Sequence, residues 1–441
     1  MSNLMLGVWS IPVLLALVFL RIPIGAAMLG VGMVGAWLVT GRWSPILSQM
    51  NAITYETFSN YSLSIVPLFL LMGQFAGRGG MSRSLFAAAE AWVGHRRGGV
   101  AMAAIGACTG FGAICGSSLA TAATMGQVAL PEMRRYGYSG TLATGTLAAG
   151  GTLGILIPPS VVLVIYAILT EQNIVKLFVA AFVPGLLAAV GYLIAIAASV
   201  RLDPASAGAP RPAAPLSTRL AALASTWPVL LVFFLVIGGI YFGWFTPTEA
   251  AAIGAAGTGV IALASRSLDW RTLARCFLDT ASASAMIFFI VIGAGMFNSF
   301  LALSQLPQSG AQWIGSLGLS PWTVMAAILL VYLAFGCVMD SLSMILLTIP
   351  IFYPMASALD FGLSPEEFAL WFGILVLVVV EVGLITPPVG LNLFIINSMA
   401  GDVPMKDTYR GVLPFIASDI VRTLLLVGFP SISLWLVRLL G

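Results

Sequence analysis

The sequence predicts an all-helical (all-α) integral membrane protein whose two halves form an inverted-topology repeat. Of its 441 residues, 60% are apolar and only 8% are charged. A soluble domain carries about a quarter charged residues, so a soluble enzyme and a nucleic-acid-binding protein are excluded. The 47 glycines and 24 prolines stand within apolar stretches, which is typical of interrupted membrane helices. Short motifs also recur in the same order on both sides of one proline-rich linker.

Ten apolar segments are candidate membrane spans, for which about 20 mostly apolar residues are needed. The first twenty residues contain no Lys or Arg and no small-residue cleavage site. We therefore expect a first span there rather than a cleaved signal peptide. The ten segments are residues 4–20, 22–40, 61–77, 140–170, 177–200, 225–243, 247–265, 279–300, 365–398 and 412–437.

Two further apolar stretches, 98–131 and 321–354, are too long for one span. Each is interrupted near its middle by glycine and serine, within Phe111–Ser118 and Phe335–Ser341. Each half is too short to cross the membrane alone. Both stretches are therefore expected to be re-entrant hairpins, the first opening from the cytoplasm and the second from the outer face.

The positive-inside rule supports this arrangement. With the N-terminus outside, ten crossings and two hairpins place fifteen of the nineteen basic residues on the cytoplasmic side. Converting either hairpin to a full crossing would invert every later segment and destroy the agreement. Both termini are therefore expected on the outer, periplasmic face.

A linker divides the chain into two related halves. Residues 201–219 contain four prolines and three arginines, and they separate a first repeat (1–200) from a second (220–441). Corresponding segments run in opposite directions, which is typical of secondary transporters with sites on broken helices near the membrane midplane. The matched motifs are Pro23–Ala27 with Pro247–Ala251 and Phe111-Gly112 with Phe335-Gly336, both 224 residues apart, and Gly154–Pro159 with Gly383–Pro388, 229 apart.

Double prolines interrupt the helix in two of the predicted spans, 140–170 and 365–398, at Pro158-Pro159 and Pro387-Pro388. Proline removes a hydrogen-bond donor and clashes with the preceding turn, so nearby carbonyl groups lose their helical partners. A bound hard cation such as Na⁺ would satisfy carbonyl and hydroxyl oxygens. The alternative is a kink whose polar groups are satisfied by neighbouring helices.

The tip of the first hairpin, Gly116-Ser117-Ser118, offers two hydroxyls and the start of a half-helix that continues with Thr121 and Thr124. Free N–H groups at a helix N-terminus favour an anion, such as a substrate carboxylate. Simple N-capping by serine is the alternative, and the two roles are compatible.

The tip of the second hairpin carries Asp340, followed by Ser341 and Ser343. An ionised carboxylate within a membrane needs a partner, and the second hairpin has no Lys or Arg. A bound cation would supply one; the alternative is a protonated or water-exposed Asp340.

Three other polar residues near the second break have open assignments. Glu381 could join the cation site, carry a proton or form hydrogen bonds within the protein. Asn392 and Asn397 could contact substrate or bond between helices.

Enzymatic and metal motifs are missing from the sequence. It contains no HExxH, GxSxG or Walker-type motif, and its four cysteines and single histidine form no zinc-ligand pattern. No catalytic residue, transition metal or nucleotide is therefore expected. A channel is a further alternative, although an inverted repeat with two hairpins favours alternating access.

Longer stretches resemble a known family. The first half contains GAICGSSLATAATMGQVALPEM, LATGTLAAGGTLGILIPPSVVLVIYAILTE and KLFVAAFVPG, and the second half contains FTPTEAAA and EVGLITPPVGLNLFIIN. These stretches are similar to the large membrane subunit of tripartite ATP-independent periplasmic (TRAP) transporters, the DctM-like family. The resemblance covers essentially the whole chain.

The resemblance implies a Na⁺-driven importer of organic acids in the bacterial inner membrane, working by an elevator mechanism without an organic cofactor. It also implies a separate small four-helix membrane subunit (DctQ-like) and a periplasmic substrate-binding protein (DctP-like). The chain begins directly with the first span of the large subunit, so the small subunit is expected as its own chain. Dicarboxylates, sialic acid, keto acids, sulfonates and ectoines all remain possible substrates.

The resemblance further implies one sodium site at each hairpin tip and its adjacent broken helix, with substrate between them. The sodium-binding residues would be Gly116, Ser117, Ser118, Gly151, Gly154, Ile155 and Pro158 in the first half, and Gly336, Asp340, Ser341, Gly383 and Thr386 in the second. The substrate-binding residues would be Ser118, Thr121, Ser160, Ser343 and Asn392.

Overall fold

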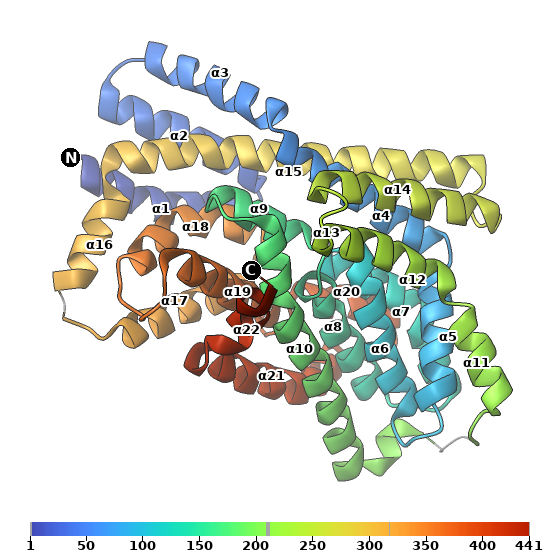
Figure 1. Ribbon diagram of the computed structural model, residues 1–441. Helices are drawn as coiled ribbons and strands as arrows, with labels where there is room; N and C mark the ends of the chain where they lie inside the picture. The colour runs from blue at the N-terminus through green and yellow to red at the C-terminus, as the bar shows by residue number, and fades with distance from the viewer. Residues whose placement is uncertain (1, 209–211, 317, 441) are drawn as a thin grey trace.

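The computed structural model describes residues 2–208, 212–316 and 318–440, and these residues form helices and turns without a β-strand (Figure 1). The all-helical fold class is therefore confirmed. The first half contains α1 (Asn3–Phe19), α2 (Ile24–Thr40), α3 (Ser44–Ser59), the 3-10 turn η1 (Tyr61–Ser64), α4 (Ile65–Arg78), α5 (Met81–Val93), α6 (Gly99–Cys115), α7 (Ser118–Arg135), α8 (Gly140–Leu156), α9 (Val161–Leu169), α10 (Ile174–Leu202) and the 3-10 turn η2 (Pro204–Ala207). The second half contains α11 (Leu216–Ala224), α12 (Trp227–Phe233), the π-helical turn η3 (Phe234–Gly238), α13 (Gly239–Tyr241), α14 (Pro247–Ala264), α15 (Trp270–Ser304), α16 (Leu306–Ser316), α17 (Pro321–Gly336), α18 (Ser341–Ser357), α19 (Pro365–Leu384), α20 (Leu391–Ala400), α21 (Met405–Gly428) and α22 (Ser431–Leu440).

Among the described residues, five helices are long and apolar enough to cross a membrane by themselves: α10, α14, α15, α19 and α21. The number rises to seven when two bent pairs, α8 with α9 and α11 with α12–α13, are each counted as one span. The other predicted spans correspond to shorter helices. The count of ten crossings, with both termini outside, thus stays a prediction.

Several boundaries differ from the predicted ones. Helix α15 has 35 residues and extends beyond the predicted span 279–300 at both ends. The predicted span 412–437 is two helices, α21 and α22, because the chain leaves helical geometry at Phe429, before a proline without a backbone N–H. Helix α11 begins at Leu216, inside the predicted linker 201–219. Helices α3, α5 and α16 were not predicted because they are less apolar than the spans.

Both predicted hairpins are pairs of helices that pack against each other, α6 with α7 and α17 with α18. The first turns at Gly116, whose φ of +64° suits glycine, and the second turns between Gly336 and Ser341. The broken helices also appear where the double prolines stand: α8 and α9 meet at 44°, and residues 385–390 separate α19 from α20. Re-entry by the same membrane face stays a prediction.

The two halves exchange helices. The motif-matched helices α2 and α14 each pack against a helix of the other half, α2 along α15 and α14 along α4. Figure 1 shows these four helices as one layer, with the hairpins and broken helices on one side of it. Below this layer, α8 of the first half packs closely on α21 of the second. Small residues permit these contacts, as is usual for helix packing in membranes.

We predict that Gly293→Val will destabilise the fold where α15 crosses α2. A Cβ atom on Gly293 would collide with the carbonyl oxygen of Gly25. Overpacking of this kind costs about 1–3 kcal/mol, so the thermal midpoint of the purified protein should fall by several degrees. Gly30→Val is the matched control, because a Cβ on Gly30 of α2 meets no atom within 4 Å. Equal midpoints for the two variants would contradict the close α2–α15 contact.

Candidate functional site

The first arm of each hairpin lies directly against the broken helix of its own half. A Cβ atom on Gly112 of α6 would be 2.9 Å from the Cα of Gly154 on α8. A Cβ on Gly383 of α19 would be 2.5 Å from the Cα of Gly336 on α17. Only glycine allows backbones this close. The same matched positions of the predicted repeat therefore make the same contact in both halves.

Each hairpin tip also contacts the double-proline break of its own half. In the first half, a Cβ on Gly116 would be 2.9 Å from the carbonyl oxygen of Pro159. In the second half, the backbone N–H of Gly390 donates to the carbonyl oxygen of Cys337 at 3.1 Å. Both Pro-Pro peptide bonds are cis. Each predicted tip is thus placed beside the predicted break.

The second arm of each hairpin begins with a side-chain cap. The hydroxyl of Ser117 accepts from the N–H of Ala120 at 3.5 Å, and a carboxylate oxygen of Asp340 accepts from the N–H of Ser343 at 3.1 Å. Asp340 is half-buried. The N-capping role considered for the first tip is therefore present at both tips. Asp340 stabilises the start of α18 whether or not it also binds a ligand.

The two tips converge on one cavity of about 70 Å³. Its walls include Ser117 and Ser118 from the first tip, Asp340 and Ser341 from the second, and Ile155 from the end of α8. Hydroxyl and carboxylate oxygens from both halves of the chain thus face one small space, which is large enough for ions or a few water molecules.

Glu381 joins the two tips. Its carboxylate is fully buried on α19 and accepts from the hydroxyl of Ser118 at 2.5 Å and from that of Ser341 at 3.2 Å. The sequence left Glu381 with three possible roles, and the structure assigns it hydrogen bonds to both tips. The sequence signal for this role was a single carboxylate near the end of an otherwise apolar helix. Burying an ionisable residue in a membrane helix costs free energy, so such a residue usually has a function.

A second predicted group lies on α8 and α20. Asn392 donates from its amide nitrogen to the carbonyl oxygen of Ala148 at 3.3 Å, and its amide oxygen is buried without a hydrogen-bond partner among the described residues. A Cβ on Gly151 would be 3.0 Å from that amide nitrogen. The hydroxyl of Thr121 lies against Gly154. Polar groups of α7 and α20 thus meet α8 next to its break.

The remaining predicted residues have local partners. Ser160 is fully buried and caps α9 by accepting from the N–H of Leu163 at 3.4 Å. The hydroxyl of Thr386 donates to the carbonyl oxygen of Val382 at 2.6 Å, within its own helix turn. Ser343 is buried, and Pro158 forms the first cis bond. The described contacts do not bring Thr386 to the cavity at the tips.

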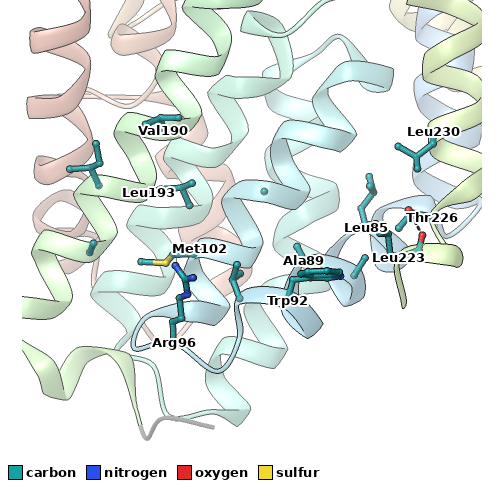
Figure 2. A pocket seen from close by; sticks show the side chains of 15 residues that line it. Leu85, Ala89, Trp92, Arg96, Met102, Val190, Leu193, Leu223, Thr226 and Leu230 are labelled. Atoms are coloured by element: carbon teal, nitrogen blue, oxygen red, sulfur yellow. Dashed lines mark hydrogen bonds between the residues drawn. The ribbon is translucent and has the colours of Figure 1, made fainter. Parts of the chain in front are cut away.

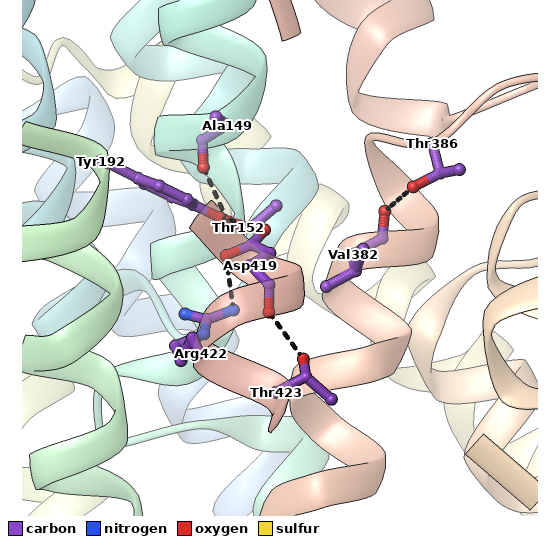
Figure 3. A network of polar contacts seen from close by, with 8 residues as sticks. All are labelled: Ala149, Thr152, Tyr192, Val382, Thr386, Asp419, Arg422 and Thr423. Carbon is purple, nitrogen blue, oxygen red and sulfur yellow. Dashed lines mark hydrogen bonds and ion pairs between the residues drawn. The ribbon is translucent and has the colours of Figure 1, made fainter. Parts of the chain in front are cut away.

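A buried ion pair that the sequence did not predict supports the same broken helix (Figure 3). Asp419 and Arg422 on α21 are 1% and 4% exposed, and an oxygen and a nitrogen of the pair lie 2.9 Å apart. Tyr192 of α10 donates to Asp419 at 2.8 Å, and its oxygen lies 2.9 Å from the hydroxyl of Thr152 on α8. An Asp and an Arg three residues apart within an apolar helix were the signal that sequence reasoning passed over.

The chain belongs to the DctM family, the large permease component of tripartite ATP-independent periplasmic transporters. Residues 11–432 match the family described as "Tripartite ATP-independent periplasmic transporter, DctM component". It is therefore a multi-pass membrane transport subunit and not an enzyme. Large permeases of this family work with a small permease and a periplasmic binding protein.

Curated relatives include several large permeases. The chain is 40% identical over 388 residues to the C4-dicarboxylate TRAP transporter large permease protein DctM of Pseudomonas aeruginosa, covering 88% of each chain. It is 33% identical over 448 residues to DctM of Rhodobacter capsulatus, covering 97% of this chain and 98% of the relative. It is 31% identical to the sialic acid large permease SiaM of Vibrio cholerae, covering 96% and 97%.

A solved structure has the same overall fold. The crystal structure of the Alcanivorax borkumensis YdaH transporter superposes with a TM-score of 0.65 at 15% sequence identity, covering 97% of this chain and 98% of that one. At this identity the likeness concerns the fold alone.

We predict that Glu381→Gln will impair uptake while preserving folding. The amide keeps the shape of the carboxylate but can accept at only one of its two terminal atoms, so one tip hydroxyl loses its acceptor. A hydrogen bond to a charged group contributes about 1.5–3 kcal/mol, so uptake should fall roughly ten-fold or more. The exposed Glu366→Gln, which loses a surface pair with Lys176, is the control. Normal uptake by Glu381→Gln at equal protein level would contradict a functional link between the tips.

Proposed function

We propose that this large permease component imports an organic acid together with Na⁺ in a bacterial inner membrane. The proposal rests on the cavity lined by both hairpin tips, together with Glu381, which accepts a hydrogen bond from a serine of each tip. The donor set there consists of hydroxyl, carboxylate and nearby carbonyl oxygens. Oxygen ligands suit a hard monovalent or divalent cation, and a transport cycle driven by an ion gradient favours Na⁺.

Two cation sites are proposed, one at each tip and its break. The first would use Gly116, Ser117 and Ser118 with the end of α8 (Gly151, Gly154, Ile155 and Pro158). The second would use Gly336, Asp340 and Ser341 with Gly383 and Thr386. The contact of each tip with its own break supports this pairing. For Thr386 a ligand role requires rotation away from Val382, to which it now donates.

The proposed solute is an organic anion bound near the same tips, with Ser118, Thr121, Ser160, Ser343 and Asn392 as candidate contacts. The N-terminal N–H groups of α7 and α18 favour a negative group. Relatives of this chain are named for C4-dicarboxylates, sialic acid and isethionate, all of which are organic anions. The amide oxygen of Asn392 is buried and has no hydrogen-bond partner in the part of the chain that the structure describes, so it is available to a hydroxyl or ammonium group of the solute.

We propose alternating access by an elevator movement. The layer made by α2, α15, α4 and α14 would remain fixed, and the hairpins and broken helices would move against it as one body. The close glycine contacts between hairpins and broken helices support a single moving body. A separate small subunit (DctQ-like) would bind the fixed layer, and a periplasmic binding protein (DctP-like) would deliver the solute. The termini are proposed to be periplasmic.

We predict that solute uptake will require an inward Na⁺ gradient. The purified large and small subunits would be placed in liposomes with candidate binding proteins, and uptake of labelled organic anions would be followed. Two Na⁺ with a dianion would be electroneutral; if more than two Na⁺ accompany each dianion, import is electrogenic and an inside-negative potential should raise the rate. Uptake driven by a proton gradient without Na⁺ would overturn the sodium proposal. Passive, gradient-independent flux would indicate a channel instead.

We predict that Asp340→Asn will weaken Na⁺ dependence without lowering protein abundance. Asparagine keeps the N-cap of α18, since Asn and Asp are equally good at that position, but it removes the negative charge. Loss of about 1.4–3 kcal/mol of cation binding would raise the half-saturating Na⁺ concentration roughly ten- to hundred-fold. The measurement is a Na⁺ titration of uptake at equal protein level.

Ser117→Ala and Ser118→Ala should act in the same direction but more weakly, because a neutral hydroxyl contributes less than a carboxylate. Asp360→Asn is the matched control, because Asp360 is exposed and does not line the cavity. A titration curve for Asp340→Asn that overlays the unmodified protein would remove Asp340 from the sodium site.

A further inference from the structure

One groove on the described surface is apolar and lies away from the hairpin tips (Figure 2). It has a volume of about 560 Å³ and runs between α5, α6, α10 and the segment from α11 to α12. Its walls are mainly leucine, valine and alanine side chains, with Met102 and Trp92. On α10 it is bordered by Val190 and Ile194, which are 51% and 63% exposed. An apolar wall this exposed is suited to contact with hydrocarbon rather than water.

One end of the groove carries a guanidinium group. Figure 2 shows Arg96 reaching from the turn below α6 toward Met102, beneath Leu193 and Val190. Of the described residues that line the groove, Arg96 is the only charged one. Among the described residues its guanidinium has no hydrogen-bond or ion-pair partner, so all of its N–H groups are available.

The side-chain donors of Trp92 and Thr226, which also line the groove, already form hydrogen bonds within the protein. The indole N–H of Trp92 donates to the carbonyl oxygen of Arg219 at 3.3 Å, and the hydroxyl of Thr226 donates to the carbonyl oxygen of Leu223 at 2.7 Å. The groove therefore combines one free cationic end with a long apolar part.

Further positive charge gathers at the same end. Arg97 follows Arg96 in sequence, and the backbone carbonyl of Arg219 accepts from the indole N–H of Trp92. The Nε of Arg219 is buried without a hydrogen-bond partner among the described residues. The nearest acidic residue in sequence, Glu90, lines a neighbouring cavity together with His95 rather than this groove. An anion at Arg96 would therefore meet no carboxylate from the groove walls.

We propose that this groove binds an acyl chain of an anionic glycerophospholipid whose phosphate is held by Arg96. The positive-inside arrangement places Arg96 at the cytoplasmic interface, where lipid phosphates lie. From Ala197 to Val190 the α10 wall runs seven residues, or about 10 Å, away from that level into the apolar region. The proposal depends on the membrane location of the chain and not on Na⁺ coupling.

The shape and charge favour a lipid over other occupants. A soluble anion would use Arg96 but would leave the apolar length of the groove uncovered. A membrane helix of a partner subunit would cover Val190 and Ile194 but has no need for a cation at the groove's end. Only a molecule with an anionic head and an apolar tail is complementary to both parts.

The test is native mass spectrometry of the purified full chain, with and without its small subunit, while lipid is added. Phosphatidylglycerol and phosphatidylcholine with identical acyl chains share the phosphate, but the choline ammonium makes the second headgroup neutral overall while the glycerol headgroup keeps a net negative charge. We expect phosphatidylglycerol to bind roughly five-fold more tightly or better. Arg96→Gln should reduce its affinity to that of phosphatidylcholine, and Arg96→Lys should keep most of the difference.

Two further variants separate the groove from general surface charge. Arg201→Gln removes an exposed arginine at the end of α10, outside the groove, and should leave both affinities unchanged. Gly106→Leu should weaken both lipids several-fold by filling the groove. A Cβ on Gly106 would be 3.7 Å from the Cβ of Ala89, so the added side chain enters without a backbone clash.

Four outcomes would overturn the proposal. They are equal affinity for the two lipids, equal losses in Arg96→Gln and Arg201→Gln, displacement of the lipid by glycerol phosphate at the same concentration, and loss of lipid binding when the small subunit is present. The third would assign the site to a soluble anion and the fourth to the partner subunit. Because the readout is lipid binding, failure here leaves the sodium proposal untouched, and the reverse also holds.

Discussion

The broken helices depend on direct backbone contact with the hairpins. Within a membrane there is no water to satisfy the polar groups that a double proline releases, so the protein must supply partners. The Gly112–Gly154 and Gly336–Gly383 contacts bring each hairpin arm onto its broken helix, and the bond from Gly390 to Cys337 uses a carbonyl at the second tip. A side chain at any of these glycines would separate the hairpin from the break and leave buried backbone groups unpaired.

Buried charge reinforces the same region from two sides. Glu381 approaches the tips from α19, and the ion pair of Asp419 with Arg422 reaches α8 through Tyr192 and Thr152. Removing one member of a buried pair costs far more than a surface pair contributes. The Glu381 contacts therefore join α19 to α7 and α18, and the contacts of the ion pair join α21 to α10 and α8, in surroundings that are otherwise apolar.

Hydropathy and proline placement predicted the fold class, both hairpin positions and both breaks, because each depends on local sequence. Helix α3 and the long helix α15 were missed or truncated, since their polar portions fall outside an apolar window. At the site, the tips could be predicted from Ser118 and Asp340. The role of Glu381 could not be predicted, because its hydrogen-bond partners lie 263 and 40 residues away along the chain. A local sequence pattern gives no information about contacts at such separations.

The exchanged helices constrain how any movement can occur. Because α2 packs on α15 and α14 packs on α4, the two sequence halves cannot separate as rigid bodies without breaking both contacts. The hairpin of each half is likewise tied to its own broken helix, and Glu381 ties the two tips to each other. The proposed elevator movement would divide the molecule between the α2–α15–α4–α14 layer and the helices beneath it, where α4 packs on α6 and α15 packs on α18. In the proposed transport cycle, the moving body therefore contains parts of both repeats. The linker divides the sequence into two halves, but these halves are not the two parts that move against each other.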